Sequence, residues 1–496
     1  MNRVLGHLKR LRNQAENKKK ISNKYHVLII VQNLPVPLDR RVWLECQSLI
    51  AAGYEVSVIC IKGPDDPDFE VVDGVSIYKY RPAPEAEGLR GFALEFTYSW
   101  IRTAVLSIKV WARKPFDVIQ ACNPPDTYWL LALLWRLRGV KFVFDQHDLN
   151  PELFLSRFGE PTSLKERTLL RGLTLLEAAT YRVADHVIST NESYRALAME
   201  RGGLPANALT VVRSGPDTSR MRPVYPSEPT VRDGFELAYL GIMGPQDGVE
   251  ILLHVMRDLV HDRGRTDVHA TLMGFGDCLE RLKKEAVALD VDHFVTFTGR
   301  AEGPLIAEVL SRADLGIGPD PKTPLNDVST MNKTMEYMAF GLPSVAFDLH
   351  ETRVSGGDAV VYVPAGDLKG YADAIEGLLA EPQRRVDMGR LARERVVSNF
   401  DWRGESVKYV SVYHALNGRP VYPATRAYSE PASGSDPQGR IYVNLRDPVE
   451  FETFLSTRGL IGPDMAAGSD QNAHDTVPEV TATEHRTLEP EAGTRW

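Results

Sequence analysis

The chain has 496 residues with a formal net charge of −8, and its four cysteines are scattered along it. Its length exceeds what one hydrophobic core usually organises, so two domains with extensions are expected. The mildly acidic balance gives no indication of a nucleic-acid partner, and the cysteines lack the spacing of a structural zinc site. No apolar run reaches the roughly 18 to 20 residues of a membrane span, and no signal-peptide core opens the sequence, so a cytoplasmic protein is predicted.

Residues 1–24 form a basic arm, rich in Lys and Arg, with Glu16 as its acidic residue. Apolar residues between Val4 and Leu11 recur at helical spacing, opposite most of the charges. This pattern is typical of segments that lie on an anionic membrane surface, where each basic residue contributes about 1 kcal/mol. A solvated, disordered leader explains it equally well, and both interpretations stay open.

Residues 25–216 alternate short β-branched runs with longer amphipathic stretches, which is typical of βαβ units. The runs are mostly continuous apolar segments, as expected for strands covered on both faces. They predict a doubly wound domain with a parallel sheet. The predicted strands are 25–31, 55–61, 75–80, 117–122, 141–147, 186–190 and 209–215.

A Pro-, Ser- and charge-rich break follows at 216–233, after which the alternation resumes in a second doubly wound domain, 234–398. Its predicted strands are 235–241, 268–274, 295–299, 315–319, 343–348 and 360–366. A helical region at 381–399 precedes a closing segment, 399–416, with a last helix at 402–416. The tail, 417–496, is expected to be largely disordered, although 441–455 has the pattern of a strand and a helical turn able to dock on the body. Ligands of such sheets bind beyond the carboxyl ends of the strands.

The segment 326–348 carries the strongest functional signal, a polar loop that leads into a short helix ending at Gly341. On a helix that starts near Asn332, Lys333 and Glu336 share a face and can reach one ligand. Exposed amides at the helix start, together with Lys333, suit a diphosphate, and Glu336 suits ribose hydroxyls. Taken alone, without the surrounding motif, Lys333 and Glu336 are better explained as an ordinary surface ion pair.

The motif N-K-x-x-E-Y-M-A-x-G-x-P resembles the donor-site signature of glycosyltransferase family 4. The resemblance implies a GT-B fold, two Rossmann-like domains facing a central cleft, with Glu336 on the nucleotide ribose and Lys333 as the phosphate cation. Many members carry a second Glu eight positions earlier, where this chain has Val328. Ser329 and Thr330 are candidates to substitute for it in part.

The segment 239–256 is similar to the family's phosphate loop. Its glycines allow backbone amides to approach a pyrophosphate closely, although strand-to-helix turns also use Gly for conformational reasons. The loop has neither Arg nor Lys, which makes Lys333 the leading phosphate cation. The donor-binding candidates are Gly244, Gln246, Asp247, Gly248, Gly274, Gly276, Ser329, Thr330 and Asn332.

In the first domain, His147 lies at the end of a predicted strand, and the resemblance implies that it contacts the transferred sugar. The nearby Asp145 and Asp148 are interpreted as loop residues. The loop after the first strand supplies the acceptor-side candidates Asn33, Asp39 and Arg40. A simple charge cluster of Asp39, Arg40 and Arg41 at a helix N-terminus is an equally good interpretation.

The resemblance implies a hexosyltransferase that moves a sugar from a nucleoside diphosphate to an acceptor hydroxyl with retention of configuration. No protein nucleophile, metal or cofactor is expected. The apolar and aromatic stretch 92–114 has basic ends, which together with the arm predicts a lipid-linked or polysaccharide acceptor at the inner membrane surface; a core helix is the alternative. Rival functions are a catalytically silent nucleotide-sugar-binding scaffold, a sugar-nucleotide epimerase and a glycogen-type synthase.

Overall fold

The computed structural model describes residues 24–63, 65–83, 88–226, 234–420, 430–431 and 434–458. Apart from Lys24, the basic arm lies outside the described residues, and so do 421–429 and 459–496 of the tail. The side chains of 84–93 are also outside them, and these include the first two residues of the apolar and aromatic stretch 92–114.

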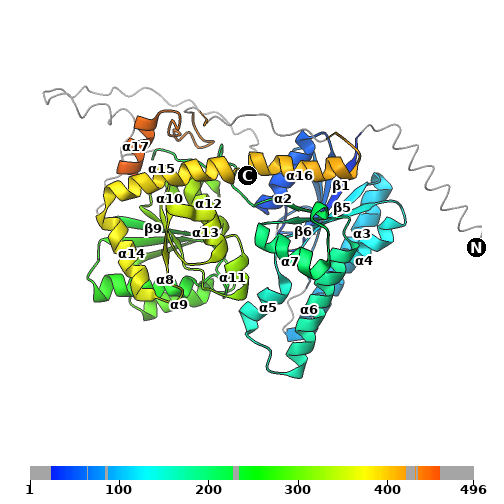
Figure 1. The fold of residues 1–496 in the computed structure, drawn as a ribbon, viewed down its shortest axis with the longest axis horizontal. Coiled ribbons are helices and arrows are strands. Elements are labelled where there is room, and N and C mark those ends of the chain that lie inside the picture. Colours follow the sequence, from blue (N-terminus) through cyan, green and yellow to red (C-terminus); the bar gives the residue numbers. More distant parts are fainter. Residues whose placement is uncertain are drawn as a thin grey trace, which may run out of the picture.

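The N-terminal domain is built on an eight-stranded sheet with the order β3-β4-β2-β1-β5-β6-β7-β8 (Figure 1). Its strands are β1 (His26–Ile30), β2 (Glu55–Ile61), β3 (Phe69–Val72), β4 (Val75–Tyr80), β5 (Val118–Cys122), β6 (Lys141–Gln146), β7 (His186–Ser189) and β8 (Leu209–Val211). Its helices are α2 (Arg40–Ala51), α3 (Gly88–Arg113), α4 (Trp129–Arg136), α5 (Asn150–Phe158), α6 (Leu164–Val183) and α7 (Glu192–Gly202). All pairings are parallel except β3 with β4.

Strand β3 was not predicted from the sequence. It pairs antiparallel with β4, with Val72 opposite Val75 across the turn residues Asp73 and Gly74. Both turn residues have positive φ, 47° and 82°, as a tight two-residue hairpin turn requires. The Asp73-Gly74 pair in the sequence therefore indicates a hairpin at this position.

The C-terminal domain has a six-stranded, all-parallel sheet with the order β11-β10-β9-β12-β13-β14. Its strands are β9 (Phe235–Leu240), β10 (Val268–Met273), β11 (Val295–Gly299), β12 (Leu315–Gly318), β13 (Ser344–Phe347) and β14 (Val360–Val363). Its helices are α8 (Val249–Arg257), α9 (Leu279–Ala288), α10 (Gly303–Arg312), α11 (Pro324–Val328), α12 (Asn332–Ala339), α13 (His350–Gly356), α14 (Leu368–Ala380) and α15 (Pro382–Asn399). The predicted architecture of two doubly wound α/β domains is confirmed.

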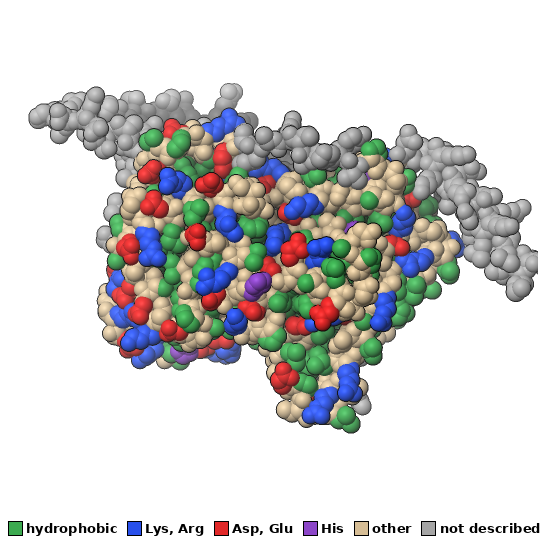
Figure 2. Space-filling view, viewed as in Figure 1, with side chains coloured by type: hydrophobic (Ala, Val, Ile, Leu, Met, Phe, Trp, Pro, Cys, Tyr) green, Lys and Arg blue, Asp and Glu red, His purple; other side chains and the backbone are tan. Residues whose placement is uncertain are grey.

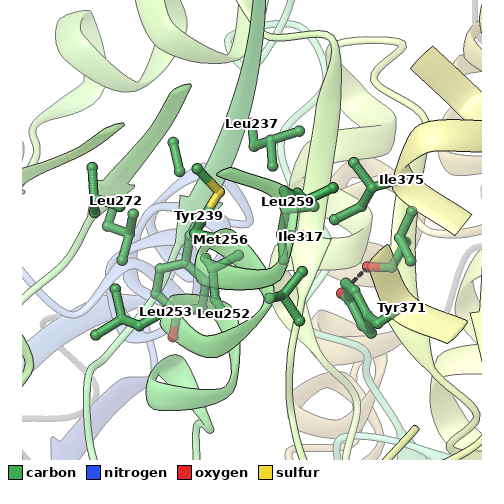
Figure 3. Close-up of a cluster of buried hydrophobic side chains, with 14 of the residues drawn as sticks. Leu237, Tyr239, Leu252, Leu253, Met256, Leu259, Leu272, Ile317, Tyr371 and Ile375 are labelled. Atoms are coloured by element: carbon green, nitrogen blue, oxygen red, sulfur yellow. Dashed lines mark hydrogen bonds between the residues drawn. The ribbon is translucent and has the colours of Figure 1, made fainter. Parts of the chain in front are cut away.

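Alternate residues of the central strands face opposite sides of each sheet, and both sides are covered. On β9, Leu237 and Tyr239 belong to the core under α8 and α14, whereas Ala238 and Leu240 belong to the core under α10 and α12. Figure 3 shows the first of these cores, in which the Tyr371 hydroxyl also donates a hydrogen bond to a β13 carbonyl at 2.6 Å. Burial on both faces explains why these strands are continuous apolar runs in the sequence.

The chain returns to the N-terminal domain through α16 (Trp402–Leu416), which packs beside α2 in that domain's core. After it, α17 (Pro448–Thr457) lies against the C-terminal domain and buries Phe454 completely (Figure 1). Arg458, which follows α17, donates hydrogen bonds to the carbonyls of Ala313, Leu310 and Gly341. Part of the tail, which was expected to be largely disordered, is thus folded onto the C-terminal domain. Most of α17 falls within 441–455, the stretch expected to dock.

Among the described residues, no helix is both long enough and apolar enough to cross a membrane.

Candidate functional site

Lys333 lies at the start of the helix that carries the sequence motif. Helix α12 begins at the exposed Asn332, whereas the Lys333 side chain is buried, with 7% of its surface exposed. Its Nζ lies 2.5 Å from Oδ1 of Asp320, in the loop after β12, and 5.3 Å from the centre of the Tyr239 ring. Lys333 therefore forms a buried ion pair with Asp320, not a surface pair with Glu336.

A second carboxylate, Asp247, influences the pKa of Lys333. Burial alone lowers the pKa of Lys333, but Asp320 and Asp247 outweigh this and raise it, so Lys333 stays protonated. Burial raises the pKa of Asp247 to about 6; Lys333 opposes this shift and Asp320 adds to it. One cation thus faces two carboxylates, and burial makes Asp247 easier to protonate than an ordinary aspartate.

The loop after β9 packs closely against the loop that bears Asp320. The backbone N–H of Gly244 donates to Oδ2 of Asp247 at 2.9 Å, and the carbonyl of Gln246 accepts from Nδ2 of Asn326 at 2.8 Å. Gly248 has a φ of +65°, and a Cβ there would lie 2.5 Å from the Pro319 carbonyl oxygen. Gly248 therefore permits both the turn and the close approach of the two loops.

Gly274 and Gly276 allow the loops after β9 and β10 to touch. A Cβ at Gly274 would lie 1.9 Å from the carbonyl oxygen of Gly241, and one at Gly276 would lie 2.8 Å from that of Met243. These glycines have a packing role that requires no ligand. Gly241 in turn lies beside the Lys333 side chain, since a Cβ there would be 3.1 Å from its Cε.

Glu336 is contacted from the other domain. Its Oε1 lies 2.7 Å from Nη1 of Arg40, the first residue of α2, whose side chain is 58% exposed. The structure thus joins a donor-side and an acceptor-side candidate across the domain interface. A ribose hydroxyl that binds Glu336 has to compete with this ion pair.

The candidates Ser329 and Thr330 also lie at the domain interface. Asn191 donates to Thr330 Oγ1 at 3.0 Å and to the carbonyl of Val328 at 2.9 Å, and the Tyr194 hydroxyl lies 2.8 Å from Ser329 Oγ. In this structure both hydroxyls hold the start of α7 against the donor-side segment.

His147 follows β6 and belongs to a charged cluster with Asp145 and Arg41. Its Nε2 lies 2.7 Å from Oδ2 of Asp145 and 3.1 Å from Nε of Arg41, and Arg41 Nη2 lies 2.9 Å from Asp145 Oδ1. The interpretation of Asp145 as a loop residue is wrong: it is fully buried in β6, paired in register with Cys122 and Ile188. Asp148 does lie beyond the strand.

A second buried carboxylate, Glu45, completes the cluster at 3.0 Å from Arg41. Burial alone raises the pKa of Asp145, but Arg41 and His147 outweigh it and hold that pKa well below its usual range. Burial and the ionised Asp145 raise the pKa of Glu45 well above its usual range. Arg41 and His147 therefore favour the ionised form of Asp145, and of the two carboxylates Glu45 is the one that takes up a proton more easily.

Gln120 connects this cluster to the returning helix α16. Its Nε2 donates to Glu45 at 2.7 Å and to Asp145 at 3.0 Å, while its Oε1 accepts from Tyr409 at 2.6 Å and also from Tyr413. The surroundings of His147 thus depend on a helix that follows the C-terminal domain in the chain.

The remaining acceptor-side candidates occupy the loop between β1 and α2. Asn33 is exposed. Asp39 caps α2 by accepting a hydrogen bond from the backbone N–H of Val42 at 3.1 Å, the helix-terminal role that the sequence allowed. Among the three candidates, Arg40 contacts Glu336 of the other domain.

Within the described part of the chain, the ligand-type atoms of Cys122, Asp145 and His147 come within 4.8 Å of one another. Arg41 binds the same carboxylate, so a metal ion here would have to displace a guanidinium. Burial also raises the pKa of Cys122 well above its usual range, which disfavours the thiolate that binds metals. We assign these residues to the charged cluster around His147.

The sequence interpretation missed Asp320, and it considered Arg41 only as part of a charge cluster at a helix N-terminus. Arg41 and Glu45 have the i,i+4 spacing of a helical ion pair, and Asp320 follows a predicted strand at the sheet edge where ligands bind. Both signals were present, but their partners Asp145 and Lys333 are brought close only by the fold.

Solved structures with this architecture include proteins described as glycosyltransferases. The sucrose-phosphate synthase of Thermosynechococcus elongatus matches with a TM-score of 0.64 and 20% identity, covering 80% of this chain and all of that one. The Anabaena protein HepE, solved in complex with UDP-glucose, matches with a TM-score of 0.56 and 15% identity over 79% of this chain and 99% of that one. The fold is therefore GT-B.

The family descriptions agree with the fold. Residues 38–215 match the glycosyl transferase 4-like domain, and residues 234–381 match glycosyl transferases group 1. The chain belongs to the family 4 type of glycosyltransferases and is a hexosyltransferase-type enzyme.

Two curated relatives are similar to it. Glycogen synthase of Mycobacterium tuberculosis is 25% identical over 408 residues, covering 78% of this chain and 93% of the relative. Phosphatidyl-myo-inositol mannosyltransferase of Mycolicibacterium smegmatis is 30% identical over 193 residues, covering 38% of this chain and 47% of the relative.

Proposed function

We propose that the protein transfers a sugar, with retention of configuration, from a nucleoside diphosphate sugar to the hydroxyl of a lipid-linked or polysaccharide precursor in cell-surface or exopolysaccharide synthesis. The observation that carries this proposal is the placement of Lys333 and Glu336 as the second and fifth residues of α12. Lys333 lies beside the loop after β9, and Glu336 meets Arg40 of the opposite domain. The UDP-glucose complex of HepE supports a nucleotide-sugar donor.

In the proposed chemistry the donor diphosphate lies between Lys333 and the loop amides near Gly244, and Glu336 binds the ribose. His147 contacts the transferred sugar, held in orientation by Asp145 and Arg41. The departing phosphate accepts the proton of the acceptor hydroxyl, so catalysis rests on positioning and charge stabilisation. This scheme uses neither a protein nucleophile nor a metal.

The donor assignment is tested by binding and hydrolysis across UDP-, GDP-, ADP- and dTDP-sugars. One donor is expected to be selected, and Glu336→Ala is expected to weaken its binding about tenfold, because a charge-assisted hydrogen bond to ribose is lost. Glu302→Ala, which changes an exposed glutamate before α10, is the control and should bind like the wild type. Equal binding of every donor to wild type and Glu336→Ala would refute the donor site and favour a silent scaffold.

The pH dependence of donor binding supplies a second test, centred on Asp247. A diphosphate beside this carboxylate favours its protonated form, so affinity should rise as pH falls from 7.5 through the Asp247 pKa of about 6. The diphosphate of a nucleotide sugar has no monoester group that titrates there. Calorimetry should show about a threefold to tenfold gain in the wild type. Asp247→Asn should bind tightly at both pH values, and the exposed Asp277→Asn should behave like the wild type.

A glycogen-type synthase is the second candidate, favoured by the similarity to a glycogen synthase along most of that relative. Sugar transfer from the selected donor should be measured to glycogen and to a polyprenyl-diphosphate sugar in parallel. Transfer to glycogen alone would replace the proposed acceptor and leave the donor site intact.

A further inference from the structure

We propose that the outer face of helices α3 and α4 binds the surface of an anionic lipid bilayer. The apolar–basic face, as we name it, consists of Ile101, Val105, Ile108, Leu130, Leu134 and Leu137, with Arg102, Lys109 and Arg138 beside them. Membrane binding would bring the enzyme to a lipid-linked acceptor, and in this respect alone the proposal rests on the proposed function.

Helix α3 is apolar on the side that faces away from the protein. Ile101, Val105 and Ile108 are 51%, 54% and 61% exposed, and their spacing of four and three residues places them on one side of the helix. The opposite side is buried through Leu106 and Val110. A surface helix normally has polar residues on its outer side, so this second apolar stripe requires a partner or an apolar medium.

Helix α4 repeats the pattern. Leu130 and Leu134 on α4 and Leu137 directly after it recur at the same spacing and are 44%, 57% and 84% exposed, while Leu131 and Trp135 are buried on the other side. Isolated exposed leucines are common on soluble proteins, but a stripe on each of two neighbouring helices marks an interaction surface.

The two helices are adjacent, so their stripes belong to one face. Nε1 of Trp135 on α4 donates to Oγ of Ser107 on α3 at 3.0 Å, and the rings of Trp111 and Trp135 are 4.8 Å apart. In Figure 2, hydrophobic and basic side chains lie together along the right edge of the molecule, where Figure 1 places α3 and α4.

The charges beside the stripes decide between possible partners. Arg102 and Lys109 are exposed and lie about a quarter turn from the apolar stripe of α3, and Arg138 is exposed two residues after the end of α4. A second copy of the chain would place like charges against one another, which is unfavourable. An anionic bilayer accepts the aliphatic side chains at its interface and attracts the basic ones.

The test is co-sedimentation of the full chain with vesicles of phosphatidylcholine and phosphatidylglycerol in equal parts, compared with phosphatidylcholine alone. The wild type should bind the anionic vesicles and release with added salt. Ile101→Gln/Leu134→Gln and Arg102→Glu/Lys109→Glu should each lower the partition coefficient about tenfold or more. Val287→Gln, which changes a 63% exposed residue of the C-terminal domain, is the matched control and should bind like the wild type.

Unchanged vesicle binding in both double variants would overturn the proposal. So would a dimeric wild type that becomes monomeric in Ile101→Gln/Leu134→Gln by light scattering, because the face would then bind a second copy. Donor binding, measured on the same proteins without vesicles, should be equal in all of them. Failure of donor binding in the wild type would reject the proposed function while leaving vesicle binding as a separate result.

Discussion

Arg41→Met is expected to lower the free energy of unfolding of the N-terminal domain by about 3–5 kcal/mol, because it leaves a buried carboxylate without its main counter-ion. Arg41 contacts Asp145 at 2.9 Å and Glu45 at 3.0 Å, and it also donates to the Val212 carbonyl and to Ser214 Oγ. Methionine keeps much of the side-chain length and supplies none of these contacts. Urea denaturation followed by tryptophan fluorescence measures the loss.

The neighbouring arginine provides the control. Arg40 is similar in chemistry and adjacent in sequence, but its side chain is 58% exposed where it pairs with Glu336. Arg40→Met should therefore cost less than about 1 kcal/mol. Similar losses in the two variants would show that the cluster around Asp145 does not contribute the expected stability.

The cluster around Asp145 also links the N-terminal domain to helix α16, which follows the C-terminal domain in the chain. Gln120 bridges Asp145 to Tyr409 on α16, and α16 can reach this position only after the chain has passed through the C-terminal domain. The core under α2 is completed by Trp402 from the same helix. The N-terminal domain therefore cannot finish its core or its polar cluster from residues 25–216 alone.

Much of the fold followed from local patterns. Strands covered on both faces require continuous apolar runs, and such runs, separated by helical stretches, predicted two doubly wound domains. Strand β3 was missed because it is an edge strand with no buried residue, so its apolar signal is short. The Asp73-Gly74 turn was its stronger signature.

The site was less predictable, because its electrostatics depend on partners distant in sequence. A motif identified Lys333 and Glu336, but neither the buried partner Asp320 nor the interdomain partner Arg40 follows from local spacing. Ser329 was selected for a possible sugar contact, whereas the fold engages it with Tyr194. Residue type and position after a strand predicted the location of these groups, and the fold determined their pairing.

Lys333→Met is expected to abolish measurable donor binding and also to destabilise the C-terminal domain by about 3–5 kcal/mol, because Asp320 would be left buried without a counter-ion. This single variant confounds two effects, since an unstable domain also binds poorly. Adding Asp320→Asn separates them. The double variant removes both charges, so most of the lost stability should return, while donor binding should stay at least about a hundredfold weaker than in the wild type.

Two measurements on the same proteins decide the role of Lys333: thermal unfolding for stability and calorimetry for donor binding. If the double variant regains stability and donor binding together, Lys333 serves only to neutralise Asp320 and the phosphate cation must be sought elsewhere. If it regains stability alone, the ammonium group itself binds the donor. The second outcome is expected because a buried, protonated Lys333 lies beside Gly241, in a loop that has no Arg or Lys of its own. Its pair with Asp320 would then hold the charge in place until the diphosphate binds.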